Sequence, residues 1–264
     1  MATIEQEGFL SEEAEQGRSV FRAKYSGVLA LAAEMNRVAI AKLQEARLSE
    51  IDDADFILYL LAIRIVEAYE AIVILMERGM VASAKLIIRP QLEALFTLAA
   101  IDKDRSLVQR YFDAQANAQF EKLKSSTKWQ ADALKAIFKE DGLEAKYIDM
   151  KKNRKAAPPA ALRPFEWAQK AEMDDYYNTY YVHYASYTHT NREALEENME
   201  WEEERVTAAF GPSDTGFYET IRHATAFTLL ATMHMCAAFK LPFTTELAGI
   251  HESIKKCDAQ YDTS

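Results

Sequence analysis

The scarcity of glycine and proline is the feature that most constrains how this chain can fold. Only 8 of its 264 residues are glycine and 6 are proline. A β-sandwich or β-barrel of this length needs many tight turns, and tight turns recruit these two residues for their special backbone dihedral angles. Alanine, leucine, glutamate and lysine are abundant instead, and each loses little entropy in a helix. The sequence therefore predicts an all-α protein.

Helix-end signals and apolar residues at helical spacing predict a bundle of about eight helices. Ser11 followed by two glutamates is typical of a helix start, and Arg78-Gly79 is typical of a helix end. The predicted helices cover residues 11–40, 49–78, 81–101, 104–124, 127–142, 174–189, 217–240 and 244–260. A short hairpin is expected near residues 200–212, beside a turn-rich loop.

Residues 151–164, with the sequence KKNRKAAPPAALRP, interrupt the helical pattern. Paired prolines do not continue a helix, and the basic run is too polar to pack in a core, so this segment is predicted to be a linker. The apolar helices before and after it need each other to bury their apolar faces. Residues 1–264 are therefore expected to form a single helical domain.

Cysteine usage and the amino-terminal sequence favour a cytoplasmic protein. The two cysteines, Cys236 and Cys257, are too few for the disulfide framework of a secreted domain. The opening sequence MATIEQEGFLSEEAE is acidic and lacks the basic-then-apolar order of a signal peptide. The longest apolar stretch, 224–239, contains His234 and is too short to cross a bilayer. We expect no membrane contact.

The charge of the chain is distributed unevenly. Its net charge of −10 disfavours nonspecific nucleic-acid binding by the whole surface. Residues 122–163, however, hold eleven Lys/Arg against five Asp/Glu, which leaves −16 on the remainder. This basic segment is either a solvated helical face or a phosphate-binding patch for a nucleic acid. In the second case Lys151, Lys152 and Arg154 are candidate substrate-binding residues.

Arg89 and Glu93 are spaced four residues apart on the predicted helix 81–101, so they share one face. Lys85 and Thr97 continue this line at the same spacing. The four residues are either the solvent-facing stripe of an otherwise buried helix or an inward-facing polar group beside Pro90. An inward Arg–Glu pair would need a hydrogen-bond network or a ligand to offset the cost of its burial.

The predicted helix 174–189 combines a Ser-x-x-His pair with a run of tyrosines. Ser186 and His189 share a face, and a histidine can act as an acid, a base or a metal ligand near neutral pH. The alternative is a packed histidine bonded to a neighbouring hydroxyl. Tyr180 and Tyr184 are candidate substrate-binding residues, although such tyrosines are more typical of cores and interfaces. The tyrosine run is also consistent with a homodimer.

Several signatures of known chemistry are missing from the sequence. It contains no Glu-x-x-His pair of the di-iron type, no His-Glu-x-x-His, no P-loop, no Gly-x-Gly-x-x-Gly and no Gly-x-Ser-x-Gly. A metal site built from Glu93, His189 and Glu193 has little support from spacing. We therefore expect neither a metal nor a cofactor.

The helix ASAKLIIRPQLEALFTLAAI (82–101) resembles the hallmark helix of a bacterial domain family of unknown function, small-x-x-x-Leu-x-x-Arg-x-x-x-Glu. Trp167 matches a tryptophan of that family, and YNTYYVHYASYTH (177–189) matches its later Ser-x-x-His helix. The resemblance covers roughly residues 50–240. It implies that Arg89, Glu93, Ser186 and His189 meet between two helices of a bundle.

A looser similarity links the chain to the HEPN group of helical-bundle ribonucleases, in which an arginine and a histidine act at a dimer interface. Members of that group carry the two residues close together on one helix. In this chain Arg89 and His189 would have to meet from separate helices.

Two functional hypotheses follow from these patterns. The first is an RNase-like or ligand-binding effector in bacterial defence or toxin biology, with His189 as the general acid or base and Arg89 stabilising charge on a phosphate. Glu93 would orient Arg89, and Ser186 would orient the histidine. The second is a non-catalytic interaction or oligomerisation module in which the polar cluster only fixes packing.

Overall fold

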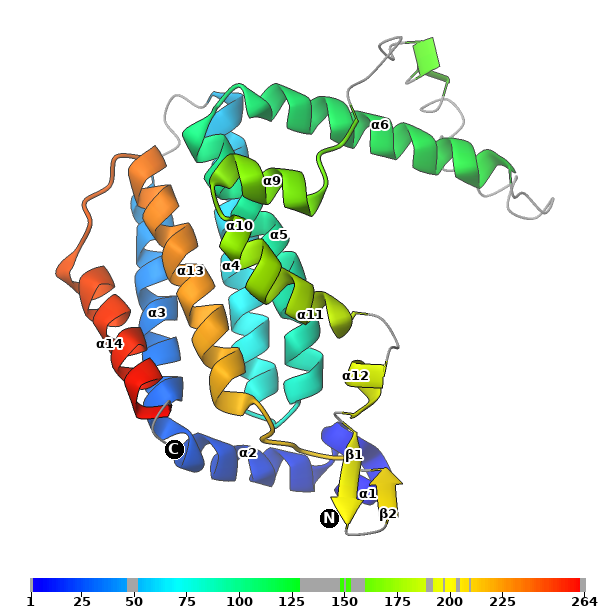
Figure 1. The fold of residues 1–264 in the computed structure, drawn as a ribbon, viewed down its shortest axis with the longest axis vertical. Helices are drawn as coiled ribbons and strands as arrows, with labels where there is room; N and C mark the ends of the chain where they lie inside the picture. Colours follow the sequence, from blue (N-terminus) through cyan, green and yellow to red (C-terminus); the bar gives the residue numbers. More distant parts are fainter. Residues whose placement is uncertain are drawn as a thin grey trace.

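The computed structural model describes residues 2–46, 52–128, 148–149, 151–152, 160–188, 192–196, 198–202, 205–208 and 210–261. Long helices dominate these residues, so the all-α prediction is confirmed (Figure 1). The physical reason is the one expected from the sequence: few glycines and prolines interrupt long runs of good helix formers.

Four long helices run side by side through the centre of the molecule (Figure 1). They are α3 (Ser26–Glu45), α4 (Asp53–Met76), α5 (Val81–Lys103) and α13 (Phe217–Ala238). Their buried side chains form one cluster, in which Tyr69, Phe96 and Phe227 are among the largest members. Helix α5 packs against α4, α13 and the later segment α9, and its residues 94–101 are all buried. A helix with this much apolar surface needs neighbours on most sides.

Shorter elements surround this centre. Helix α14 (Thr245–Tyr261) packs on α3 and α13, and α6 (Leu107–Lys128) leads away from one end of the bundle (Figure 1). A continuous tract then crosses α5: α9 (Pro164–Ala171), α10 (Asp174–Tyr176), the π-helical turn η2 (Tyr177–Tyr181) and α11 (Val182–Ser186). Most of the predicted helix 174–189 is therefore helical, with a π-turn inside it.

A two-stranded hairpin lies where the sequence suggests one. Strands β1 (Met199–Glu202) and β2 (Arg205–Ala208) pair antiparallel, with Met199 opposite Ala208. The hairpin lies near the short amino-terminal elements α1 (Ile4–Glu7) and η1 (Gly8–Leu10) in Figure 1. The five-residue helix α12 (Arg192–Glu196) precedes it in the chain.

The prediction of one continuous helix over residues 11–40 is wrong, because the structure has two helices there. Ser11 caps α2 (Glu12–Lys24) as expected, by accepting a hydrogen bond from Ala14 N. The helix ends at Lys24, and after Tyr25 the chain continues as α3 in a different direction (Figure 1). The Tyr25 ring stacks on Phe217 at 3.9 Å between centroids, and its hydroxyl contacts Asp214. These tertiary contacts hold α2 across the end of the bundle.

Other predicted boundaries fall close to the observed ones, and some lie outside the described residues. Helix α5 begins at Val81 and continues through Pro90, and α6 reaches Lys128. The predicted helix 127–142 lies almost wholly outside the described residues, as do most of the basic segment 122–163 and positions 153–159 of the linker.

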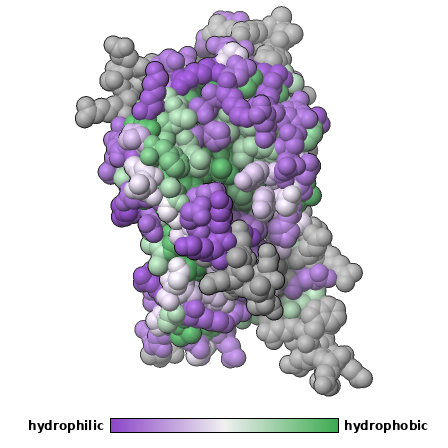
Figure 2. Space-filling view, turned by 60° about the vertical axis from the view of Figure 1, so that its left-hand side comes forward, coloured by the Kyte–Doolittle hydropathy of each residue, from purple (hydrophilic) through white to green (hydrophobic). Residues whose placement is uncertain are grey.

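The surface is mixed in character. Hydrophilic residues cover most of the face shown in Figure 2, and hydrophobic residues gather in its upper half. A membrane-spanning helix would need a longer apolar run than any helix in the described part of the chain provides.

Candidate functional site

The polar face of α5 packs against the tyrosine-rich tract. Lys85 and Thr97 are buried, and the side chains of Arg89 and Glu93 are 28% and 40% exposed. This line of residues is therefore not a solvent-facing stripe, because the η2–α11 tract covers much of it. The helix spacing of four residues places the side chains in a row, and the tertiary packing gives them partners.

Arg89, Glu93 and Tyr181 form a closed triangle of hydrogen bonds, which we call the polar triangle. The Arg89 Nε donates to Glu93 Oε1 and to Tyr181 Oη, each over 3.1 Å. The Tyr181 hydroxyl donates to the same Glu93 Oε1 over 2.8 Å. The Arg89 guanidinium carbon also lies 5.3 Å from the centre of the Tyr181 ring. A charged pair with this many partners is fixed in orientation.

The other end of Arg89 is held by the turn that follows α11. Its Nη1 donates to Thr188 Oγ1 over 2.6 Å, and that hydroxyl donates in turn to the Ala185 carbonyl over 2.8 Å. Within the described residues, the Arg89 Nη2 has no hydrogen-bond partner. The guanidinium therefore keeps N–H donors that can bind an anionic ligand.

The surroundings of the polar triangle keep the arginine charged and the tyrosine neutral. Partial burial lowers the pKa of Arg89, but the hydrogen bonds with Glu93 and Tyr181 outweigh this effect and raise it overall. Burial, followed by the hydrogen bond to Glu93, raises the pKa of Tyr181 to about 12. At neutral pH the tyrosine is thus a hydrogen-bond donor to the carboxylate.

The candidate residues on the tyrosine-rich tract occupy different places. Ser186 Oγ donates to the His183 carbonyl over 2.7 Å and has no hydrogen bond to Arg89 or Glu93. His189 lies outside the described residues. Arg89 and Glu93 thus bond each other and share Tyr181 as a partner, and Arg89 also bonds Thr188. Neither of them bonds Ser186 within the described residues.

Tyr180 and Tyr184 belong to a second polar contact, on α13. The Tyr184 hydroxyl lies 2.7 Å from His223 Nδ1, and the residue is only 1% exposed. Tyr180 packs edge-on against His223, with ring centroids 4.8 Å apart. Both tyrosines therefore face α13 and lie away from the polar triangle. The other candidate substrate-binding residues are Lys151 and Lys152, which are exposed, and Arg154, which lies outside the described residues.

The protonation state of His223 follows from its neighbours. Burial, then the charge of Arg222, lowers the pKa of His223 to about 3, so the ring is neutral at pH 7. Arg222 Nη2 lies 2.9 Å from His223 Nε2, and a guanidinium can only donate. Nε2 must therefore accept, which leaves the proton on Nδ1, where it is donated to Tyr184 Oη.

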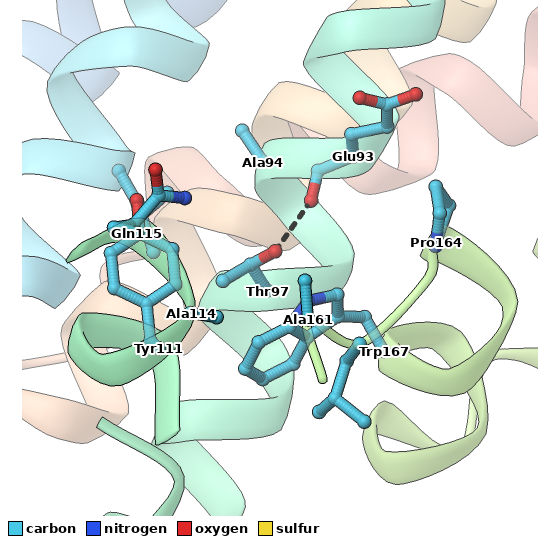
Figure 3. Close-up of a pocket in the computed structure, with 11 residues that line it drawn as sticks. Glu93, Ala94, Thr97, Tyr111, Ala114, Gln115, Ala161, Pro164 and Trp167 are labelled. Carbon is cyan, nitrogen blue, oxygen red and sulfur yellow. Dashed lines mark hydrogen bonds between the residues drawn. The ribbon is translucent and has the colours of Figure 1, made fainter. Parts of the chain in front are cut away.

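A pocket of about 300 Å³ includes Glu93 in its lining, but neither Arg89 nor Tyr181. Figure 3 shows Glu93 at one side of it, Tyr111 and Gln115 from α6 at another, and Trp167 from α9 opposite them. The wall between them is mostly apolar and includes Leu61, Ala94, Ala114, Ala161, Leu162 and Pro164. The Thr97 hydroxyl lines the pocket and donates to the Glu93 backbone carbonyl over 2.9 Å.

No metal centre emerges from the described part of the chain, which holds no group of three or more His, Cys, Asp or Glu side chains arranged around a common point. The metal site considered from the sequence used Glu93, His189 and Glu193. The side chains of the last two lie outside the described residues.

The sequence pointed to Arg89 and Glu93 on α5, but it did not single out their hydrogen-bond partners Tyr181 and Thr188. Tyr181 lies in the tyrosine run, but nothing in its spacing distinguishes it from its five neighbours. Thr188 adjoins His189 and could have been considered as a hydroxyl partner. Trp167 was noted only for its match to the family's tryptophan, and Tyr111 carries no signal of its own, because aromatic residues in helices are mostly core residues.

Comparison with known proteins adds one relationship. A family described as a family of unknown function (DUF5677) matches residues 55–206, which is more than half of the chain. The matched region includes all the residues of the polar triangle and Trp167. No curated protein and no solved structure matches the chain.

Proposed function

The chain belongs to the family of unknown function DUF5677, and we propose from its polar triangle that it is an RNase-like effector. Arg89 binds a phosphate of the nucleic acid in this proposal. The observation that carries it is the orientation of the Arg89 guanidinium. Glu93 and Tyr181 bond its Nε and Thr188 bonds its Nη1, while its Nη2 has no hydrogen-bond partner within the described residues.

Phosphate binding fits the chemistry of this arginine. A guanidinium presents its donors in a rigid fork that matches two phosphate oxygens. Glu93 and Tyr181 occupy only the Nε side of the fork. The partial burial of Arg89 lowers the local dielectric constant, which strengthens its attraction for an anion that displaces water from the site.

The general acid or base in this proposal is His189. It directly follows Thr188 in the chain, and Thr188 is the hydrogen-bond partner of Arg89 Nη1. Histidine is the side chain most often used for proton transfer near neutral pH, and RNA cleavage requires removal of a proton from the attacking hydroxyl. Arg89 would stabilise the charge that develops on the phosphate.

The direct test is RNA cleavage by the purified chain. The parent protein is expected to cleave single-stranded RNA, and the Arg89→Ala and His189→Ala variants are expected to lose that cleavage. Arg37→Ala is a matched control, because Arg37 also forms an ion pair, with Glu246, on the exposed surface of α3. Cleavage by both site variants at the rate of the parent would refute the proposal.

A second candidate function is a non-catalytic oligomerisation module. Two exposed apolar side chains lie close in sequence to the polar triangle: Val182, which directly follows Tyr181 and is 53% exposed, and Leu86 on α5, which is 42% exposed. In this case the polar triangle holds the η2–α11 tract in place for contact with a second copy. Arg89→Ala would then lower the melting temperature without a separate loss of activity.

The mass of the protein in solution separates the two candidates. An oligomerisation module is expected to be a dimer that Val182→Asp converts to a monomer without unfolding, as measured by light scattering and circular dichroism. An RNase that acts as a monomer would retain its cleavage rate in the same variant. If Val182→Asp loses both dimerisation and cleavage, the RNase acts as a dimer.

A further inference from the structure

A second, open pocket of about 410 Å³ lies between α6 and α9. Its lining consists of Arg110, Leu162, Glu166, Gln169 and Lys170. Helix α9 lies beside the first turns of α6, where Tyr111 packs against Trp167 with ring centroids 6.4 Å apart (Figure 1). The packing of the two helices therefore brings one cation from each of them to the same pocket.

Arg110, on α6, is a half-buried cation without a counter-ion. Among the described residues it forms no ion pair, and its sealed Nε has no hydrogen-bond partner. Its Nη2 reaches the Ala160 carbonyl only over 3.5 Å, beyond the usual length of about 2.9–3.0 Å. Because Nε is covered, Nη1 and Nη2 are the donors that a ligand can reach. A guanidinium partly removed from water is unfavourable when it is unpaired, and a bound anion offsets that cost.

Lys170 supplies the second cation, from α9. Its side chain is exposed and forms no ion pair in the part of the chain that the structure describes. Gln169 precedes it and adds an amide that can donate a hydrogen bond. Both residues line the same pocket as Arg110. Two cations and an amide around one pocket form a donor set for an anion with several oxygens.

Glu166 is the one acidic residue of this lining, and its carboxylate is already engaged. Its Oε2 accepts from the Arg163 backbone N over 2.8 Å and from Arg163 Nε over 3.2 Å. These hydrogen bonds lower the pKa of Glu166, and the charges of Arg163 and Arg110 lower it further. The positive field of Arg110 thus reaches the pocket. With Arg110 and Lys170 against Glu166, the lining carries a net charge of +1.

We infer that this pocket binds a phosphate group, which places two phosphate oxygens on Nη1 and Nη2 of Arg110 and its remaining charge beside Lys170. The fork of guanidinium donors matches two phosphate oxygens. A phosphate monoester has a third free oxygen for Lys170 or Gln169, which a carboxylate lacks. The phosphate can belong to a free small molecule or to the backbone of RNA, because both present the same oxygens.

This inference goes beyond the proposed function, because Arg89 does not line this pocket. Leu162 lines both this pocket and the pocket that includes Glu93, so the two pockets are neighbours on the surface. Phosphate binding at Arg110 requires no RNA cleavage and is tested by binding alone.

The experiment measures binding of inorganic phosphate to the full chain by isothermal titration calorimetry. The melting temperature is also recorded at increasing phosphate, with sodium chloride holding the ionic strength constant. The parent should bind phosphate and melt at a higher temperature, because a ligand that binds only the folded state stabilises it. Arg110→Gln should bind at least about tenfold more weakly, as the loss of charged hydrogen bonds permits. Lys170→Gln should bind severalfold more weakly.

The control is Arg64→Gln, which removes an exposed arginine on α4, outside this pocket. It should bind phosphate as the parent does. In phosphate-free buffer, Arg110→Gln should melt no lower than the parent, because it removes a half-buried charge that has no counter-ion. Weaker phosphate binding by this variant is then not a result of unfolding.

Two further variants test the sign and the shape of the site. Glu166→Gln removes the opposing charge and keeps a side chain that can cap α9, so it should bind phosphate severalfold more tightly. Arg110→Lys keeps the charge but loses the fork, and its affinity should lie between those of the parent and Arg110→Gln. Weaker phosphate binding by Glu166→Gln would contradict an anion site here.

AMP and a ten-nucleotide RNA separate the two sources of phosphate. If Arg110→Gln weakens RNA binding, the site takes a phosphate of the nucleic acid. If it weakens only the binding of inorganic phosphate and AMP, the site takes a free small phosphate compound.

The outcomes also separate this inference from the proposed function. No phosphate binding by the parent, or unchanged binding by Arg110→Gln, would overturn the inference. Phosphate binding that is lost in Arg89→Ala but unchanged in Arg110→Gln would place the anion at Arg89 alone, and the proposed function would stand without this site. Phosphate binding that depends on Arg110 in a parent that does not cleave RNA would leave this site standing without the proposed function.

Discussion

The Tyr181 hydroxyl donates a hydrogen bond of 2.8 Å to Glu93 Oε1, which links the π-helical turn η2 to helix α5. The same hydroxyl accepts from Arg89 Nε. One tyrosine oxygen therefore fixes both members of an ion pair that is 28% exposed at the arginine and 40% exposed at the glutamate. An exposed i,i+4 ion pair by itself holds its two side chains only loosely in one geometry. The hydrogen bonds with Tyr181 fix the geometry of Arg89 and Glu93.

Removal of the Tyr181 hydroxyl should destabilise the chain and loosen Arg89. Tyr181→Phe is expected to lower the free energy of unfolding by about 1–2 kcal/mol, because hydrogen bonds to charged groups contribute about 1.5–3 kcal/mol and the Glu93 side chain is 40% exposed. Tyr59→Phe is the control, since the Tyr59 hydroxyl has no hydrogen-bond partner in the described residues, while its ring packs on Phe239. Equal denaturant midpoints for the two variants would contradict the role given to Tyr181.

Lysine should not replace arginine at position 89. Arg89→Lys keeps the charge, but its three N–H donors cannot bond Glu93, Tyr181, Thr188 and a ligand at once, and lysine lacks the planar fork. We expect the affinity for a single-stranded RNA oligomer to fall on the order of tenfold, measured by fluorescence anisotropy. An unchanged affinity would mean that Arg89 does not contact the phosphate.

Acid should destabilise the protein through His223. Burial lowers the folded-state pKa of His223 to about 3, whereas an unfolded histidine titrates near 6.5. Between these values the unfolded chain binds more protons, so stability falls as the pH drops from about 6.5 towards 3. In His223→Gln, which can still pair with Arg222 and Tyr184, the denaturation midpoint should depend less on pH between 7 and 4.5.

The control for this pH effect is His251→Gln, which changes an exposed histidine on α14. Its midpoint should follow the parent profile. A parent-like acid dependence in His223→Gln would show that other groups cause the loss of stability.

Two glycine substitutions should shift stability in opposite directions. Gly79 has φ +71°, and a Cβ atom there would lie 2.7 Å from both Phe21 and Pro212, so Gly79→Ala should cost at least about 1–3 kcal/mol. Gly249 lies in α14 with open space around it, and Gly249→Ala should stabilise by about 0.5–1 kcal/mol. The free energy of unfolding of both variants is measured by chemical denaturation. A loss of stability in Gly249→Ala as well as in Gly79→Ala would contradict the prediction.

Some features of the site were predictable because they depend on local geometry. The four-residue spacing of Arg89 and Glu93 puts them on one face of any α-helix, and they do form an ion pair. Ser11 caps α2 because its short side chain reaches Ala14 N within one turn.

The position of Ser186 depended on a feature that is hard to read from the sequence. In η2 the Val182 N–H bonds the Tyr177 carbonyl, five residues back instead of four. This extra residue in the turn rotates the following positions relative to an ideal helix. Tyr181 and Thr188, which are seven residues apart, both bond Arg89, whereas Ser186 donates to the His183 carbonyl.

The sequence by itself determined that the chain is helical and that Arg89 and Glu93 share a helix face. Both follow from interactions within a few residues: side-chain entropy, capping and the helix repeat. Only the tertiary structure decided which segment covers that face, where α2 turns at Tyr25, and that Trp167 and Glu93 line one pocket. Those outcomes depend on contacts between residues far apart in the chain, which helical periodicity does not encode.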